Sequence, residues 1–374
     1  MKVILYIGHH KVGSTALQAF LARNWAALAR SGILYPSVDG RGYAQNLSQL
    51  LNKTQPKHLP PHLREPHNAL AYQMIADVSR RPIPDQFGQL PGTAAMLDMI
   101  RQQTDALEPH TVILCAEAFA NFGEVGPDLI TRLCAAFPAA EFTVYCALRR
   151  PDEYLASWHG QRLKVGEPAA PLRSSGLKHY LKTIHFNYRT VVSAWVERVP
   201  AARLILRNYA DILATGGSVE DFSEHCALSL PDEIEPQGRA NPSLPLAAFA
   251  VMERANKALA PQPRHNLSMF LQRQAGALCP VANRDVEVFG APQREQMLAA
   301  FRPHEAYLAE LIGQPRFFDD LDSILIPRTV PDQDAARQLL DVIDPETIPH
   351  PIPRDFIRSL KSSFVPQRQA QHLS

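Results

Sequence analysis

Residues 3–15, VILYIGHHKVGST, place a glycine-containing loop directly after a short, continuous apolar run. Such a run, rich in branched side chains, is typical of a buried parallel strand. Beyond the loop, apolar residues recur at helical spacing: Leu17, Phe20, Leu21, Trp25 and Leu28. Backbone N–H groups and the positive end of a helix dipole meet at such a loop, so it can bind an anion. Strand, loop and helix in this order predict an α/β fold.

Further apolar runs alternate with helical stretches along the chain. Strands are expected at 33–36, 111–117, 141–151 and 203–209, and helices around 96–106, around 127–136 and over the core anchors Tyr188 and Trp195. This alternation predicts a P-loop-like α/β fold, in which a parallel sheet is flanked by helices. Ligands of such sheets bind at the carboxyl ends of the strands. Residues 245–312 have only a helical pattern, which predicts a mostly helical C-terminal part.

The expected domain organisation is one large domain with two proline-rich additions. Residues 1–312 form the domain, and 245–312 are its helical cap. Residues 53–95 are a proline-rich insertion, in which QPKHLPPHLREPHN has neither helical nor strand period and indicates a loop. Residues 313–374 are a proline-rich C-terminal tail that wraps the domain or frays.

Composition restricts the class of protein. Apolar residues make up 46% and charged residues 20%, which is typical of a globular chain. The formal net charge of +1 gives no global field toward nucleic acid or an anionic membrane, so any anion site is local. Five cysteines, an odd number in mostly apolar surroundings, favour reduced thiols. We find no apolar run long enough for a signal peptide or a membrane span, and expect a cytoplasmic protein.

The loop itself resembles a nucleotide-binding P-loop with a displaced lysine. Gly8 and Gly13 have the P-loop separation and Thr15 stands at the hydroxyl position, but Ser14 replaces the lysine. The nearby lysine is Lys11, inside the loop. The pattern fits an altered nucleoside-triphosphatase loop, a loop for a ligand with a different outer group, or a turn without ligand.

A second motif, LRRPDEYLASW at 148–158, follows the strand expected at 141–151. Two arginines end the strand, and Pro151 stands at the favoured first position of a helix. Arg149 and Ser157, eight residues apart, could converge on one phosphate through charge-assisted hydrogen bonds. Arginines at a strand end also occur as ordinary ion pairs, so this motif alone is ambiguous.

Together, GHHKVGSTALQ and RRPDEYLAS resemble the two cofactor motifs of the sulfotransferases that use 3′-phosphoadenosine 5′-phosphosulfate (PAPS). The resemblance implies that the first motif binds the 5′-phosphosulfate, through Lys11, Gly13, Ser14 and Thr15. Val12 departs from the hydroxyl residue usual in the family. The second motif, through Arg149 and Ser157, would grip the 3′-phosphate. The resemblance covers about residues 2–312.

The implied activity is transfer of the sulfuryl group from PAPS to a hydroxyl or amine of a carbohydrate, lipid or small metabolite, leaving 3′,5′-ADP. Such a transfer needs in-line positioning and neutralisation of developing charge. Lys11 would stabilise the departing phosphate. No metal is expected, and His9 and His10 are adjacent, so that their side chains diverge.

A transfer of this kind also needs a general base. Glu117, at the end of the strand expected at 111–117, is the leading candidate, because burial would raise its pKa toward neutrality. The resemblance places a Ser-x-Glu at this strand end, although Cys115 stands at the serine position. His10 is the rival base. Alternatively, Glu117 caps the next helix or pairs with an arginine.

Residues 159–185 are polar and basic, with glycines and prolines. They fit a lid or an acceptor-binding segment, in which Arg162, Lys164 and Arg173 would meet an anionic acceptor. A solvated surface loop fits equally well.

Two other functions remain compatible with the sequence. One is a P-loop kinase or nucleoside triphosphatase, although no expected strand ends in the aspartate that would hold magnesium. The other is a non-catalytic nucleotide-binding protein that keeps the loop.

Overall fold

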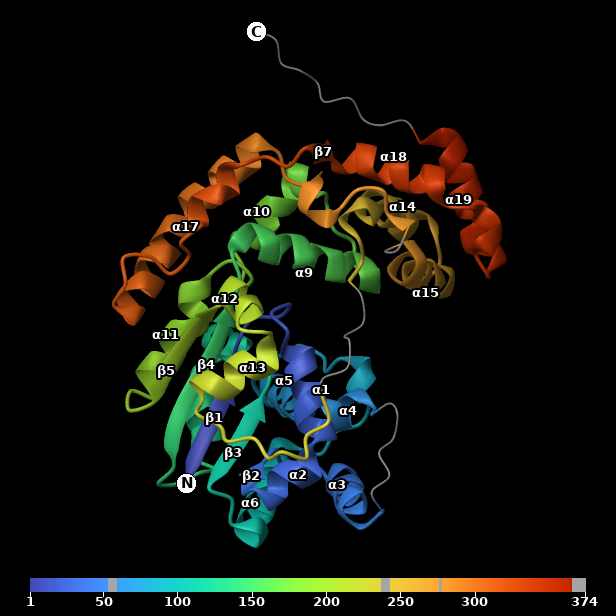
Figure 1. Cartoon of the computed structure of the whole chain (residues 1–374). Helices are drawn as coiled ribbons and strands as arrows, with labels where there is room; N and C mark the ends of the chain where they lie inside the picture. Colours follow the sequence, from blue (N-terminus) through green and yellow to red (C-terminus); the bar gives the residue numbers. More distant parts are fainter. Residues whose placement is uncertain (53–58, 237–242, 276–277, 365–374) are drawn as a thin grey trace. The chain divides into compact units, whose positions relative to one another are not determined.

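The computed structural model describes residues 1–52, 59–236, 243–275 and 278–364 (Figure 1). The chain forms two compact units, each built from three segments. The first unit comprises Met1–Arg150, Asn187–Ala240 and Ala306–Phe317, and the second comprises Pro151–Phe186, Asn241–Glu305 and Phe318–Ser374. These boundaries differ from the expected division into 1–312 and 313–374.

Within the described residues, the first unit contains a sheet of five parallel strands (Figure 1). The strands are β1 (Lys2–Tyr6), β2 (Ile33–Leu34), β3 (Thr111–Cys115), β4 (Glu141–Leu148) and β5 (Arg203–Asn208), in the order β2-β3-β1-β4-β5. All five were expected from the apolar runs, and each lies within one residue of the expected start or inside the expected range. The prediction of an α/β fold with a parallel sheet is confirmed.

The central strand explains the burial of the sheet. β1 pairs with β3 on one side and β4 on the other, with Tyr6 opposite Cys115 and Tyr145. All five residues of β3 are buried, as are Val3 to Tyr6. A strand covered on both faces needs a continuous apolar sequence, which is what these runs supply.

Helices complete the first unit. They are α1 (Ser14–Arg23), α2 (Trp25–Arg30), α3 (Gly40–Asn52), α4 (Pro61–Arg64), α5 (Pro66–Val78), α6 (Thr93–Leu107), α7 (Phe122–Val125), α8 (Asp128–Cys134), α11 (Tyr188–Arg198), α12 (Tyr209–Ala214) and α13 (Ser218–His225). Two 3-10 turns, η1 (Asp85–Phe87) and η2 (Glu117–Asn121), lie among them. The expected core anchors Tyr188 and Trp195 are both buried on α11.

The prediction of a loop for QPKHLPPHLREPHN is wrong for its described part. Residues 61–64 form α4, and α5 begins at Pro66. Most of α5 is buried, and it packs against β3. Both helices begin with proline, whose fixed φ suits the first helical position, where no N–H acceptor is available. Residues 53–58 of the expected insertion lie outside the described residues.

The second unit is mostly helical, as the sequence predicted for its C-terminal part. Its helices are α9 (Pro151–Val165), α10 (Leu177–Tyr180), α14 (Phe249–Ala258), α15 (Pro261–Phe270), α18 (Asp332–Val342) and α19 (Pro351–Ser363). Shorter turns are η3 (Leu172–Gly176), η4 (Leu246–Ala248), η5 (Leu271–Ala275), η6 (Asn283–Asp285), η7 (Leu321–Leu325) and η8 (Pro345–Thr347). Helix α17 (Ala291–Ile312) contributes residues to both units.

The prediction of a meandering C-terminal tail is also wrong for its described part. β7 (Val330–Pro331) pairs in parallel with β6 (Val286–Glu287), so this segment completes a small sheet. α18 buries Leu339 and Leu340, and α19 buries Ile357. Residues 365–374 lie outside the described residues. In the described part of the chain, no helix is long and apolar enough to cross a membrane.

An ion-pair cluster fixes the first turn of α9. Nη1 of Arg294 lies 3.7 Å from Oδ2 of Asp152, and both side chains are almost fully buried. Nη2 of the same arginine lies 2.9 Å from Oε2 of Glu287 on β6. Asp152 therefore serves the second unit as a buried structural carboxylate, in addition to its favourable place in the first helical turn.

Candidate functional site

The loop between β1 and α1 lies at the carboxyl end of the central strand and is held by β4. The N–H of Ile7 donates to the carbonyl of Tyr145, and the N–H of His9 donates to that of Ala147. A Cβ added at Gly8 would lie 2.9 Å from the backbone nitrogen of Ala147. Glycine at this position therefore lets the chain pass close to the neighbouring strand.

Gly13 ends the loop and caps α1. Its φ of 83° lies in the left-handed region, and an added Cβ would overlap Oγ of Ser218, the first residue of α13. That hydroxyl donates to the carbonyl of Val12 at 3.4 Å. Both conformation and space require glycine, so the structure explains this motif residue independently of any ligand.

Lys11 also has a left-handed backbone, with a φ of 63°. A non-glycine residue in this region costs about 1–2 kcal/mol. Strained backbones of this kind concentrate at functional sites, where the surrounding structure maintains them.

The N-terminus of α1 is suited to an anion. The helix has ten residues, and no acidic residue stands in its first turn. Ser14 is buried and Thr15 is exposed. The N–H groups of the first helical residues have no acceptor within the helix, and the helix dipole is positive here. Lys11 and Gly13 in the loop, and Ser14 and Thr15 at the start of α1, all lie at this helix N-terminus.

Arg149, at the end of β4, lies beside this loop. Its guanidinium carbon is 5.2 Å from the centre of the Tyr209 ring, and a Cβ added at Gly13 would lie 3.7 Å from the same ring. Tyr188 makes a second connection: its hydroxyl donates to the carbonyl of Arg149 at 2.6 Å, and its ring meets His9 edge-on at 4.4 Å. Two tyrosines thus join the loop to Arg149.

Glu117 stands on the other side of β1, just beyond the end of β3. Its Oε1 lies 3.8 Å from Nδ1 of His10, and its side chain is 13% exposed. Gln18, four residues into α1, donates to Oε2 of Glu117 at 2.9 Å and to the carbonyl of Cys115 at 3.2 Å. The two candidate bases, Glu117 and His10, are therefore neighbours.

The expected rise in the pKa of Glu117 does not occur. Burial raises the pKa of this carboxyl, but the interaction with His10, its own backbone N–H and a hydrogen bond from Asn68 outweigh burial. The pKa falls from 4.5 to about 2. Glu117 is therefore ionised at neutral pH and is a weak base. The sequence argument considered burial and missed the neighbouring donors.

His9 differs sharply from its neighbour. Its side chain is buried, and burial first, then the charge of His10, lowers its pKa to about 3. His9 is therefore neutral at physiological pH and packs against Tyr188.

Sequence reasoning missed several residues of this cluster. Asn68, from α5, donates to Oε2 of Glu65 at 3.3 Å and accepts from the N–H of Ala118 at 3.2 Å. Burial, and then the charge of Glu117, raises the pKa of Glu65. These residues lie in the stretch that the sequence assigned to a loop. The sequence signal that could have placed them is Pro66, because proline is favoured at the first position of a helix.

Ser157 lies on α9 in the second unit. Two of the basic residues expected to meet an acceptor have internal partners. Nε of Arg162 lies 2.7 Å from Oε2 of Glu167, and Arg173 pairs with Asp332. Burial lowers the pKa of Lys164. Over the ranges that the structure describes, no group of three or more His, Cys, Asp or Glu side chains could hold a metal ion.

No family model and no solved structure matches this chain. A protein of Archaeoglobus fulgidus, described as uncharacterized, is 29% identical over 182 residues. The match covers 47% of this chain and 47% of the relative, so the chain spans about half the length of that relative.

Proposed function

We propose that this protein is a PAPS-dependent sulfotransferase that moves a sulfuryl group to a hydroxyl or amine of a carbohydrate, lipid or small metabolite. The observation that carries the proposal is the position of Arg149, which lies beside the glycine loop and is joined to it by Tyr209. Arg149, from the second motif, and the residues of the first motif thus belong to the same unit. We also infer a P-loop-like fold, because the loop leads from the central strand into α1.

In this proposal the loop holds the 5′-phosphosulfate. The N-terminus of α1, with the hydroxyls of Ser14 and Thr15, binds its oxygens, and Lys11 neutralises the oxygen that leaves with the phosphate. Arg149 binds the 3′-phosphate. Opposite charge at both phosphates orients the co-substrate for in-line displacement.

The geometry favours His10 over Glu117 as the general base. Glu117 is a weak base, but its carboxylate beside Nδ1 orients the imidazole and stabilises the imidazolium, as in other carboxylate–histidine pairs. The acceptor oxygen or nitrogen attacks sulfur while the bond from sulfur to the phosphate oxygen breaks. The acceptor proton passes to Nε2 of His10, and 3′,5′-ADP leaves. Glu117 is then a positioning residue.

The first test is ligand binding by thermal shift. We expect 3′,5′-ADP to raise the melting temperature and ATP with magnesium to leave it unchanged. Arg149→Gln should weaken the stabilisation by 3′,5′-ADP, whereas Arg189→Gln, an exposed arginine of α11 in the same unit, should not. Stabilisation by ATP with magnesium alone would reject the proposal in favour of a kinase or nucleoside triphosphatase.

The second test is transfer of label from PAPS carrying radioactive sulfur to a panel of glycans, lipids and small metabolites. Lys11→Ala should abolish transfer. His10→Gln should lower the rate by about 10²–10⁴, the usual contribution of a general base, while 3′,5′-ADP still binds. If 3′,5′-ADP binds but no member of the panel accepts label, the protein is a non-catalytic nucleotide-binding protein.

We also propose a cytoplasmic location. All five cysteines are free thiols, namely Cys115, Cys134, Cys146, Cys226 and Cys279. Reduced cysteines are the rule in that compartment.

A further inference from the structure

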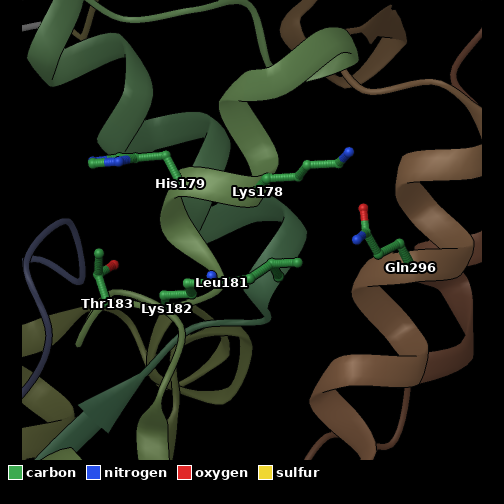
Figure 2. A pocket seen from close by; sticks show the side chains of 6 residues that line it. All are labelled: Lys178, His179, Leu181, Lys182, Thr183 and Gln296. Atoms are coloured by element: carbon green, nitrogen blue, oxygen red, sulfur yellow. The ribbon is translucent and has the colours of Figure 1, made fainter.

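The second unit contains an open cavity of about 600 Å³ beside the short helix α10. Its lining residues are Lys178, His179, Leu181, Lys182, Thr183 and Gln296. Figure 2 shows Lys178 and Gln296 extending toward one another from α10 and α17, with His179 and Thr183 on the opposite side of the α10 turn. Cavities of this volume hold small molecules.

The lining has an excess of positive charge. It contains two lysines and a histidine and no acidic residue. Lys178 and Lys182 are four residues apart, and both are exposed. In the described residues no carboxylate lies within ion-pair distance of either lysine. Arg162 and Arg173, in contrast, are paired with Glu167 and Asp332. The charges of Lys178 and Lys182 at the cavity are therefore not offset by a neighbouring carboxylate of the described residues.

The neutral lining residues add hydrogen-bonding capacity. The Thr183 hydroxyl donates to the carbonyl of Tyr180 at 2.9 Å and can still accept a hydrogen bond, while the Gln296 amide can donate and accept, which suits hydroxyl groups of a ligand. Leu181 offers an apolar contact. Lysines placed at a cavity attract an anion as compact point charges.

We propose that this cavity binds a small organic anion, about one or two sugar rings in size, whose carboxylate or sulfate group lies at Lys178 and Lys182. The neutral part of the ligand contacts Leu181, Thr183 and Gln296. The proposal does not depend on sulfuryl transfer, because all six residues belong to the second unit.

The test is isothermal titration calorimetry of the full chain with glucuronate, and with glucose as the uncharged match. We expect glucuronate to bind and glucose to bind at least about tenfold more weakly, since hydrogen bonds to a charged group contribute more than neutral ones. The double variant Lys178→Gln/Lys182→Gln should raise the Kd for glucuronate about tenfold or more. Lys257→Gln, an exposed lysine of α14 in the same unit, should leave it unchanged.

Several results would overturn the proposal. These are the absence of glucuronate binding, equal binding of glucose, or an unchanged Kd in the double variant. If inorganic sulfate bound the protein as tightly as glucuronate and displaced it, the assignment to an organic ligand would be overturned. Circular dichroism should show that the double variant is folded, because both substituted side chains are exposed. Failure of the PAPS assays would leave these results unaffected.

Discussion

Gly13 is the residue of the loop with the least freedom to change. Its positive φ and the position of Ser218 both oppose a side chain. We expect Gly13→Ala to lower the free energy of unfolding by about 1–3 kcal/mol and to weaken binding of 3′,5′-ADP, because the loop must shift. Urea denaturation and thermal shift would measure the two effects.

Gly40→Ala is the matched control for this substitution. A Cβ at Gly40, the first residue of α3, meets no atom within 4 Å, and its φ is not positive. Its stability and ligand binding should be unchanged or slightly improved, since alanine favours a helix over glycine. A Gly13→Ala protein as stable as Gly40→Ala would contradict the geometry described for the loop.

Glu117 makes the stability of the protein sensitive to acid. Its pKa of about 2 in the folded protein lies below its ordinary value of 4.5, so the ionised form stabilises the fold. This contribution is complete above about pH 4.5 and is lost as the pH falls through about 2. Glu117→Gln should therefore be less stable at pH 7, by at most about 3 kcal/mol, and the difference should vanish toward pH 2.

The measurement is urea denaturation of both proteins at pH 7, 4 and 2.5. Glu295→Gln, an exposed position on α17, controls for the loss of one carboxylate. Stability differences that stay constant over this pH range would show that His10 and Asn68 do not hold the charged form.

At this scale the sequence indicated the candidate residues that a local spacing can reveal. Lys11, Gly13, Ser14 and Thr15 are adjacent in the chain, and Arg149 follows a strand that is easily recognised. Asn68 and Glu65 could not be found in this way, because they lie on α5 and directly before it, about 50 residues away from Glu117 in the sequence.

At the scale of elements, the buried Asp152 holds α9 in the second unit. Asp152→Asn removes one partner of Arg294, which keeps Glu287. We expect a loss of about 3 kcal/mol of unfolding free energy, typical of breaking a buried ion pair. Asp334→Asn, an exposed residue in the first turn of α18, should cost only about 0.3–1 kcal/mol, the value of a helix-dipole interaction. Equal losses in chemical denaturation would exclude a special role for the cluster.

Proline explains which elements were predicted and which were not. The strands were recognisable because burial on both faces demands apolar runs. The proline-rich stretches were mistaken for loops, although Pro61, Pro66 and Pro351 stand in the first turns of α4, α5 and α19. Proline occurs both where a helix ends and where a helix begins. The two cases can be distinguished by whether the residues after the proline show apolar positions at helical spacing.

At the scale of the whole molecule, the thiols report on the packing of the core. Cys115, Cys146 and Cys226 are buried, and burial raises the pKa of each of them. A thiol reagent should therefore modify at most Cys134 and Cys279 rapidly in the native protein and all five cysteines in urea. Rapid native modification of four or five would contradict the buried positions.

The second unit is assembled from segments that begin at residues 151, 241 and 318, and two of the three segments of the first unit lie between them in the sequence. A ribosome synthesises the chain from the N-terminus. Strand β6 therefore cannot pair until β7 has been synthesised, and the helices α18 and α19 follow later still. Until those residues emerge, the apolar faces of α14 and α15 lack part of their cover. The newly made chain should therefore depend on chaperones until α18 and α19 have been synthesised.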